Sequence, residues 1–241
     1  MGQATRYLCL PFEFDVSRLQ NDVLQLRNVH WLDHYNNQAH EKSWTCLPLR
    51  SLEGRIDNIF AQSDGDFRDT EMLMACPYFQ YVLAQFQCQT TSVRLMSMQA
   101  GGRILPHRDA GGGYEDGVAR LHIPIFTTPD VVFFIDGERI HFSAGKTWYM
   151  NANCVHAVEN NSTQERIHLV LDCVPNLWLT TIFEAAGWQK NAAPKYGDPN
   201  INDDNVSLII MQLQTSGQPA ALQMAQQLSL IQQGCALANA D

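Results

Sequence analysis

The sequence has few charged residues and no long apolar segment. Charged side chains make up 17% of the 241 residues and hydrophobic ones make up 45%, so the chain can bury a large core. This balance excludes an intrinsically disordered chain, which combines low hydrophobicity with high charge. No apolar run approaches the roughly 20 residues that a membrane-spanning helix requires, so no membrane segment is predicted.

Basic residues are also scarce. Lys and Arg number 16 against 25 Asp and Glu, which gives a formal net charge of −9. Because an acidic surface repels phosphate backbones and anionic lipids, nucleic acids and membranes are excluded as expected partners. The residues from Met1 to Arg6 contain no apolar signal core and no lipidation motif, so we expect a cytoplasmic protein.

The seven cysteines, from Cys9 to Cys235, include no C-x-x-C pair. An odd number without this spacing favours reduced thiols over a framework of disulfides, as is usual in the cytoplasm. We therefore expect most of them to pack as small hydrophobic side chains.

From residue 92 onward, short strand-like runs are separated by turn residues at the spacing of an antiparallel sandwich or barrel. The runs cover residues 92–98, 120–126, 131–135, 138–142, 146–150, 155–159 and 166–174. Between two of them, Asp136 and Gly137 predict a two-residue hairpin turn. In the run 120–126, Arg120 and His122 alternate with aliphatic residues, so one strand face is polar. Buried arginines without partners would cost several kcal/mol, which indicates anionic ligands inside the fold.

Helices are predicted on both sides of this region. Asp15 follows a strand-like run over residues 6–14 and is a suitable N-cap for an amphipathic helix through Leu26. Further helices are predicted over residues 70–87, where Pro77 starts or kinks the helix, and over residues 177–186, 206–213 and 220–233. We expect one domain over residues 1–188. The polar residues 189–241 would form a small helical appendage that packs on this domain or on a second subunit of a homodimer.

The clearest chemical signal is His107-x-Asp109, which precedes a run of glycines. Side chains alternate along a strand, so at a strand end this imidazole and this carboxylate share one face and can point at one ion. The tripeptide alone favours a structural role, but His156 on a later strand supplies a second imidazole. Two histidines and one carboxylate form the metal site of non-haem Fe(II) oxygenases. On the next strand, the planar fork of Arg166 fits the carboxylate of a keto acid.

Five motifs together resemble the aspartyl/asparaginyl β-hydroxylase family, in particular its bacterial branch that hydroxylates free amino acids such as proline. They are His107-x-Asp109, Arg120 to Ile125, Gly145 to Trp148, His156 to Asn160, and Arg166 to Val170. The resemblance implies a mainly β fold, a double-stranded β-helix (jelly roll, cupin-like) with flanking helices. It also implies a dioxygenase that uses Fe(II), 2-oxoglutarate and O2, with ascorbate in support. The reaction would hydroxylate an unactivated C–H bond of an amino acid, free or within a peptide or carrier-bound residue.

The same resemblance assigns roles to the residues that carry it. His107, Asp109 and His156 would be the iron ligands and so the catalytic centre. Arg166 would pair with the distal carboxylate of 2-oxoglutarate.

Four further residues follow from the matched motifs. His122 would contact the co-substrate near the metal, and Arg94 would face the pocket as a second co-substrate residue. Arg120 would bind a carboxylate of the substrate or co-substrate. His168 repeats the Arg-x-His pattern and either lines the pocket against the substrate or, as we favour, is a hydrogen-bonded interior histidine.

Two other functions use the same residues. A zinc-dependent cupin-like enzyme would have the same metal ligands. A jelly-roll module without catalysis would use its arginines to capture a dicarboxylate. His30, His34 and His40 lie near aromatic residues but lack acidic or thiol partners at fixed spacing. For these histidines we favour plain surface over a loop that faces the substrate.

Overall fold

The structure is a computed structural model that describes residues 5–36, 40–61, 65–189, 195–198 and 200–234. The chain divides into two compact units, one within residues 4–190 and the other within residues 191–241. The predicted boundary after residue 188 falls close to this division. Six cysteines in the described ranges are free thiols, and Cys235 lies outside those ranges.

Eight strands of the described chain form the larger of two antiparallel sheets. Across the sheet their order is β1 (Tyr7–Glu13), β11 (Lys146–Met150), β8 (Ala119–Phe126), β13 (Arg166–Cys173), β6 (Thr90–Met98), β4 (Trp44–Leu52) and β2 (Leu32–Asp33), with β5 (Phe67–Asp69) also paired to β4. The central strands β8, β13, β6 and β4 are buried on both faces, because helices cover one face and the second sheet covers the other.

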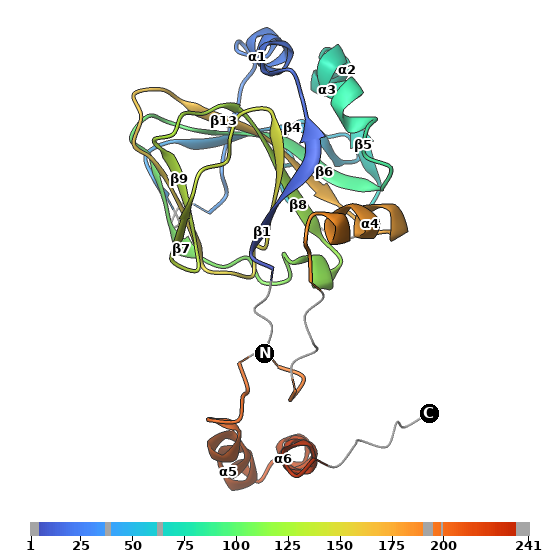
Figure 1. Cartoon of the computed structure of the whole chain (residues 1–241), viewed down its shortest axis with the longest axis vertical. Coiled ribbons are helices and arrows are strands. Elements are labelled where there is room, and N and C mark those ends of the chain that lie inside the picture. Colours follow the sequence, from blue (N-terminus) through green and yellow to red (C-terminus); the bar gives the residue numbers. More distant parts are fainter. Residues whose placement is uncertain (1–4, 37–39, 62–64, 190–194, 199, 235–241) are drawn as a thin grey trace. The chain divides into compact units, whose positions relative to one another are not determined.

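The smaller sheet has five strands in the described residues. Their order is β10 (Glu138–Ile140), β9 (Val131–Ile135), β12 (His156–Asn160), β7 (Arg103–His107) and β3 (His40–Glu41). From β6 to β13 the chain passes back and forth between the two sheets, which face each other in Figure 1. This is the topology of a jelly roll, so the predicted fold class is confirmed.

The hairpin between β9 and β10 has the predicted turn. Asp136 and Gly137 both adopt positive φ values, 46° and 81°, and Ile135 pairs with Glu138. Positive φ at both central residues defines a type I′ turn, which Gly accepts without steric cost.

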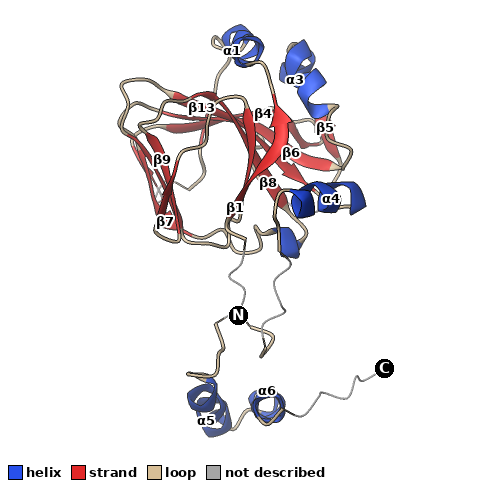
Figure 2. Cartoon of the chain, in the orientation of Figure 1, coloured by secondary structure: helices blue, strands red, loops and turns tan. Residues whose placement is uncertain are grey.

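Helices α1 (Val16–Gln25), α2 (Glu71–Met74), α3 (Pro77–Leu83) and α4 (Leu177–Ala185) lie on the side of the larger sheet away from β7 and β9 (Figure 2). The Asp15 carboxylate accepts the Arg18 backbone N–H at 3.0 Å, which confirms the predicted cap of α1. The prediction of one helix over residues 70–87 is wrong. The chain breaks after α2, and Pro77 starts α3 at its first position, where its missing N–H leaves no bond unmade.

The alternation of polar and aliphatic residues in the central strands separates the core into two parts. Leu121 and Ile123 of β8 pack with Leu19 of α1 in the cluster beneath the helices. Between the sheets, a second cluster includes Met96 and Phe133. His122 points into that inner layer, since adjacent side chains on a strand lie on opposite faces. The jelly roll thus keeps its polar side chains between the sheets.

The second unit contains α5 (Val206–Ser216) and α6 (Pro219–Gln232), at the two predicted positions. They pack together through a small apolar cluster that includes Val206, Ile210 and Leu228. No helix within the described ranges has the length and hydrophobicity to cross a bilayer.

We predict that the cluster beneath the helices carries much of the stability of the first unit. Leu19 is 0% exposed and Leu24 of the same helix is 48% exposed. Leu19→Ala should lower the free energy of unfolding by about 2–5 kcal/mol, because it removes buried contacts and leaves a cavity. The matched Leu24→Ala substitution should change the free energy of unfolding by no more than roughly 0.5 kcal/mol. Urea denaturation measures both, and equal effects would contradict the packing described.

Candidate active site

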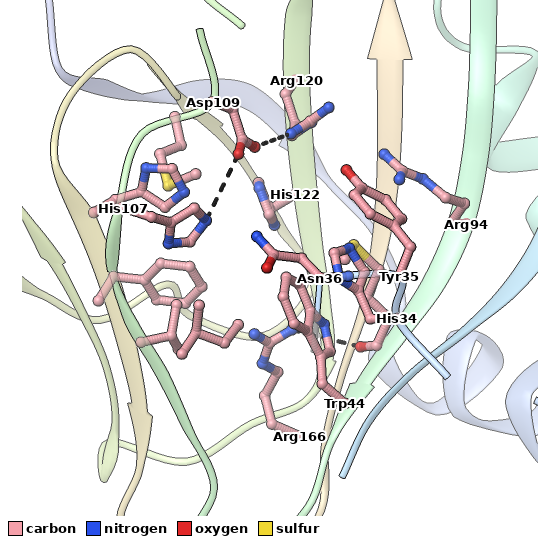
Figure 3. Close-up of a pocket in the computed structure, with 16 residues that line it drawn as sticks. His34, Tyr35, Asn36, Trp44, Arg94, His107, Asp109, Arg120, His122 and Arg166 are labelled. Atoms are coloured by element: carbon pink, nitrogen blue, oxygen red, sulfur yellow. Dashed lines mark hydrogen bonds and ion pairs between the residues drawn. The ribbon is translucent and has the colours of Figure 1, made fainter. Parts of the chain in front are cut away.

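The three predicted metal ligands meet at one point between the sheets. His107 ends β7, His156 begins β12, and these two residues face each other in the antiparallel pairing of the strands. Their ring centroids are 4.2 Å apart. One ligand atom from each of His107, Asp109 and His156 lies within 4.8 Å of the other two. Figure 3 shows His107 and Asp109 facing one another across the pocket rim, with His107 Nε2 3.7 Å from Asp109 Oδ1.

Each of the two histidines is held in place by a hydrogen bond at Nδ1, which leaves Nε2 to face the centre of the site. Nδ1 of His107 lies 2.8 Å from the Leu105 carbonyl oxygen, and Nδ1 of His156 lies 3.0 Å from that of Cys154. A carbonyl oxygen only accepts hydrogen bonds, so each Nδ1 carries a proton and a neutral ring keeps its Nε2 lone pair free. Burial, the largest influence, lowers the pKa of His156 and favours this neutral form. The donor set therefore fits a divalent transition metal.

Asp109 is fixed at three of its atoms. Its backbone N–H donates to the Ala152 carbonyl at 2.9 Å. Its Oδ2 accepts from Arg120 Nη1 at 2.8 Å, while Oδ1 faces His107. The carboxylate thus offers one oxygen to a metal and binds the protein with the other.

A buried ion-pair network extends from Asp109 into the larger sheet. Asp172 of β13 accepts from Arg120 Nε and from Arg94 Nη2, both at 2.7 Å. The second terminal nitrogen of Arg94 donates to the Ile59 carbonyl at 3.1 Å. Asp172 was not among the predicted site residues, and its charge partly neutralises both arginines that were predicted to bind ligands.

Arg166 stands apart from this network. It is 3% exposed, lines the pocket, and forms no ion pair with any acidic residue in the described ranges. Its one hydrogen bond, from Nη1 to the Met96 carbonyl, is long at 3.5 Å, and its Nε has no partner among the described residues. Burial lowers the pKa of Arg166 to about 10, so it remains a cation at neutral pH. A buried cation of this kind needs an anionic ligand.

The two remaining predicted histidines differ in position. His122 lines the pocket, and neither of its ring nitrogens has a hydrogen-bond partner in the described chain. Burial lowers the pKa of His122 well below its usual value. His168 packs 5.7 Å from the Phe133 ring and is not among the described residues that line the pocket. His168 is therefore an interior histidine, as favoured, but its ring nitrogens lack the predicted hydrogen bonds among the described residues.

One wall of the pocket comes from the segment for which plain surface was favoured over a loop that faces the substrate. His34, Tyr35 and Asn36 follow β2 and line the pocket (Figure 3). His34 is 6% exposed and stacks on Trp44 with a centroid distance of 3.5 Å. The prediction of plain surface is therefore wrong for His34. The clustering of histidines with aromatic residues in this segment was the only signal for this wall.

The fold and the site together define a jelly-roll protein with a two-histidine, one-carboxylate metal site. The family model for aspartyl/asparaginyl β-hydroxylases matches residues 13–175. The chain belongs to this family.

A curated relative and two solved structures are similar to the chain. L-proline cis-3-hydroxylase 1 from Streptomyces sp is 22% identical over 165 residues, which cover 66% of this chain. The matched segment spans 57% of that relative's length. An oxidoreductase of the 2OG-Fe(II) oxygenase family from Burkholderia pseudomallei has a TM-score of 0.43 and 13% identity, covering 67% of this chain and 80% of its own. A Pseudomonas putida prolyl-4-hydroxylase has a TM-score of 0.46 and 10% identity, and the match covers 71% of this chain and 94% of that protein's chain.

We predict that the Asp172 network makes the fold sensitive to acid. Burial alone would raise the pKa of Asp172, but the charges of Arg120 and Arg94 outweigh it and hold the pKa below its usual value. The stabilisation is therefore present above the unfolded-state pKa of about 3.9 and is lost as the pH falls through the lower folded value.

Asp172→Asn should lower the free energy of unfolding at pH 7 by about 3–5 kcal/mol, because it leaves two buried guanidinium groups without a counter-charge. It should also flatten the loss of stability below pH 4, which denaturant titrations at several pH values measure. As the control, Asp57→Asn removes an exposed pair with Arg55 and should leave the free energy of unfolding nearly unchanged, because solvent screens such a pair. If Asp172→Asn loses stability below pH 4 as steeply as the wild-type protein does, Asp172 is not the source of the acid sensitivity.

Proposed function

We propose that the protein is an Fe(II)/2-oxoglutarate-dependent dioxygenase that hydroxylates an unactivated C–H bond of an amino acid, free or within a peptide or carrier-bound residue. One oxygen atom of O2 would enter the new hydroxyl group. The other would enter succinate as 2-oxoglutarate loses CO2. The proposal rests on one juxtaposition, in which three metal-ligating side chains meet beside Arg166, a buried cation without an acidic partner. The family match and the name of the proline-hydroxylating relative support it.

His107, Asp109 and His156 would hold the iron. Three protein ligands on one face leave coordination positions open for other molecules. When bound, Fe(II) supplies the activation of O2 that an unactivated C–H bond requires. The protein's part is to aim both imidazoles, with Nε2 turned to the metal, through their Nδ1 hydrogen bonds to carbonyl groups.

Arg166 and His122 would receive 2-oxoglutarate. The guanidinium fork of Arg166 matches the distal carboxylate with two parallel hydrogen bonds, one of which would satisfy its Nε–H, which has no partner among the described residues. His122 is neutral and can donate one hydrogen bond and accept another inside the same pocket. Both side chains come from the larger sheet, opposite β7 and β12.

Arg120 would act mainly through Asp109. By donating to Oδ2 it would fix the carboxylate and leave Oδ1 turned toward the metal. Arg94 and Arg120 share the single charge of Asp172, so the network retains a positive charge that can attract a carboxylate of the substrate. We do not extend substrate contact to His168, since it is absent from the lining of the pocket in the described chain. Ascorbate as a supporting reductant, a cytoplasmic location and a homodimer remain predictions.

We predict that Arg166→Ala raises the KM for 2-oxoglutarate by roughly 10- to 100-fold, because it removes hydrogen bonds to a charged group. Iron binding, measured by titration under anaerobic conditions, should stay nearly intact. Arg103→Ala, at an exposed position of β7, is the control and should leave both the KM for 2-oxoglutarate and the affinity for iron unchanged. Equal loss of iron and 2-oxoglutarate binding in Arg166→Ala would mean that this arginine supports the fold instead.

The proposed reaction itself is tested by succinate formation. The wild-type protein should convert 2-oxoglutarate to succinate slowly without substrate, and only with Fe(II). Asp109→Gly should abolish hydroxylation and the iron-dependent succinate, because it removes one ligand from a set of three. Undiminished turnover in this variant would remove Asp109 from the metal site. Zinc in the purified protein with no turnover would favour the zinc-dependent alternative.

A further inference from the structure

The charges around the pocket do not balance for a zwitterionic substrate. Among the described residues that line the pocket, the charged ones are Arg94, Arg120, Arg166 and Asp109. With Asp172 behind them, three guanidinium groups face two carboxylates. A divalent metal and dianionic 2-oxoglutarate cancel each other, so one positive charge remains for the substrate to neutralise.

Each oxygen of the two carboxylates at the site already faces an arginine or the proposed metal position. Asp109 gives Oδ2 to Arg120, and its Oδ1 faces His107 at the metal position. Asp172 gives Oδ1 to Arg120 and Oδ2 to Arg94. A free amino acid would bring a carboxylate that suits this site and an ammonium that meets no acidic partner. Burying such a charge without a partner is unfavourable.

The pocket wall formed by His34, Tyr35 and Asn36 is neutral and suited to an amide. The Asn36 backbone N–H donates to Nδ1 of His34 at 3.3 Å, so the His34 proton sits on Nε2. His34 is fixed between the rings of Trp44 and Tyr35, at centroid distances of 3.5 and 4.4 Å. Figure 3 shows the Asn36 side chain pointing into the pocket toward the side of His107. Its amide can donate to one partner and accept from another, as an acylated nitrogen and its carbonyl require.

The wall continues outward as exposed apolar surface. Tyr35 is 53% exposed and its ring lies 5.0 Å from that of Phe60, which is 49% exposed. A neighbouring pair of exposed aromatic rings at the edge of a pocket offers contact area for a group that extends beyond it. A substrate with a substituent on its nitrogen would cover these rings, whereas a free amino acid would not reach them.

We propose that the substrate is an N-acylated amino acid with a free carboxylate, which enters as a monoanion. This inference rests on the proposed function. The carboxylate would neutralise the charge retained by Arg94, Asp172 and Arg120. The acylated nitrogen would face the Asn36 amide, and the acyl group would lie along Tyr35 and Phe60. The C-terminal residue of a short peptide has the same chemistry.

The test compares each of the twenty amino acids with its N-acetyl derivative. The full chain with Fe(II), 2-oxoglutarate and O2 is assayed for succinate above the substrate-independent rate, and for a product heavier by one oxygen. We expect at least one N-acetyl amino acid to be turned over with a kcat/KM tenfold or more above that of its free form. Binding is measured in parallel by calorimetry, with Mn(II) in place of iron and without oxygen, and should show the same preference.

A variant tests the charge argument directly. Asn36→Asp keeps the size of the side chain and adds a carboxylate where an ammonium would lie. The ratio of N-acetyl to free amino-acid affinity should fall about tenfold or more. Asn161→Asp, at an exposed position outside the pocket, is the matched control and should leave the ratio unchanged.

The outcomes separate the two proposals. If free amino acids are turned over as well as or better than their N-acetyl forms, the proposed substrate class is wrong and the proposed function still stands. The same holds if no compound of the panel is turned over while succinate still forms without substrate. Loss of the iron-dependent basal succinate would instead overturn the proposed function. An unchanged affinity ratio in Asn36→Asp would contradict the role of the wall.

Discussion

The site depends on the hydrogen bond from Arg120 to Asp109, which joins the two sheets of the jelly roll. Arg120 belongs to the larger sheet, and Asp109 follows a strand of the smaller one. The pairing of β7 with β12 brings the histidines together, but the carboxylate lies on a loop and needs this bond to face them. Asp172 in turn holds Arg120, so a buried ion pair in the larger sheet sets the position of a ligand in the smaller one.

The fold provides this arrangement by separating two kinds of core. One face of β8 and β13 packs aliphatic side chains beneath the helices, and the other presents arginines and histidines to the space between the sheets. Burying so many polar groups is unfavourable unless each finds a partner. Arg94 and Arg120 find theirs in the protein. Among the described residues Arg166 has no acidic partner and His122 has no hydrogen-bond partner, and under the proposed function 2-oxoglutarate would bind both.

Local patterns predicted the elements whose limits depend on nearby residues. The strands at 131–135 and 146–150, the Asp15 cap and the turn at Asp136 all follow from sequence neighbours. One feature depends on contacts between distant segments and was missed. Asp172 looks like one polar residue in a buried strand until β6 and β8 place arginines beside it. For His34 the sequence shows aromatic residues nearby, but it does not show that the His34 ring stacks on Trp44 and is buried by it.

The central claim is that His107, Asp109 and His156 bind one iron ion beside a 2-oxoglutarate-binding arginine. Anomalous diffraction at the iron absorption edge, from crystals grown anaerobically with Fe(II) and 2-oxoglutarate, tests this most directly. We expect a single strong anomalous peak for iron about 2.0–2.3 Å from Nε2 of both histidines and from one Asp109 oxygen, the usual range for such bonds. We also expect electron density for a carboxylate against the Arg166 guanidinium. An iron peak bound by other residues, or no iron at these three side chains, would contradict it.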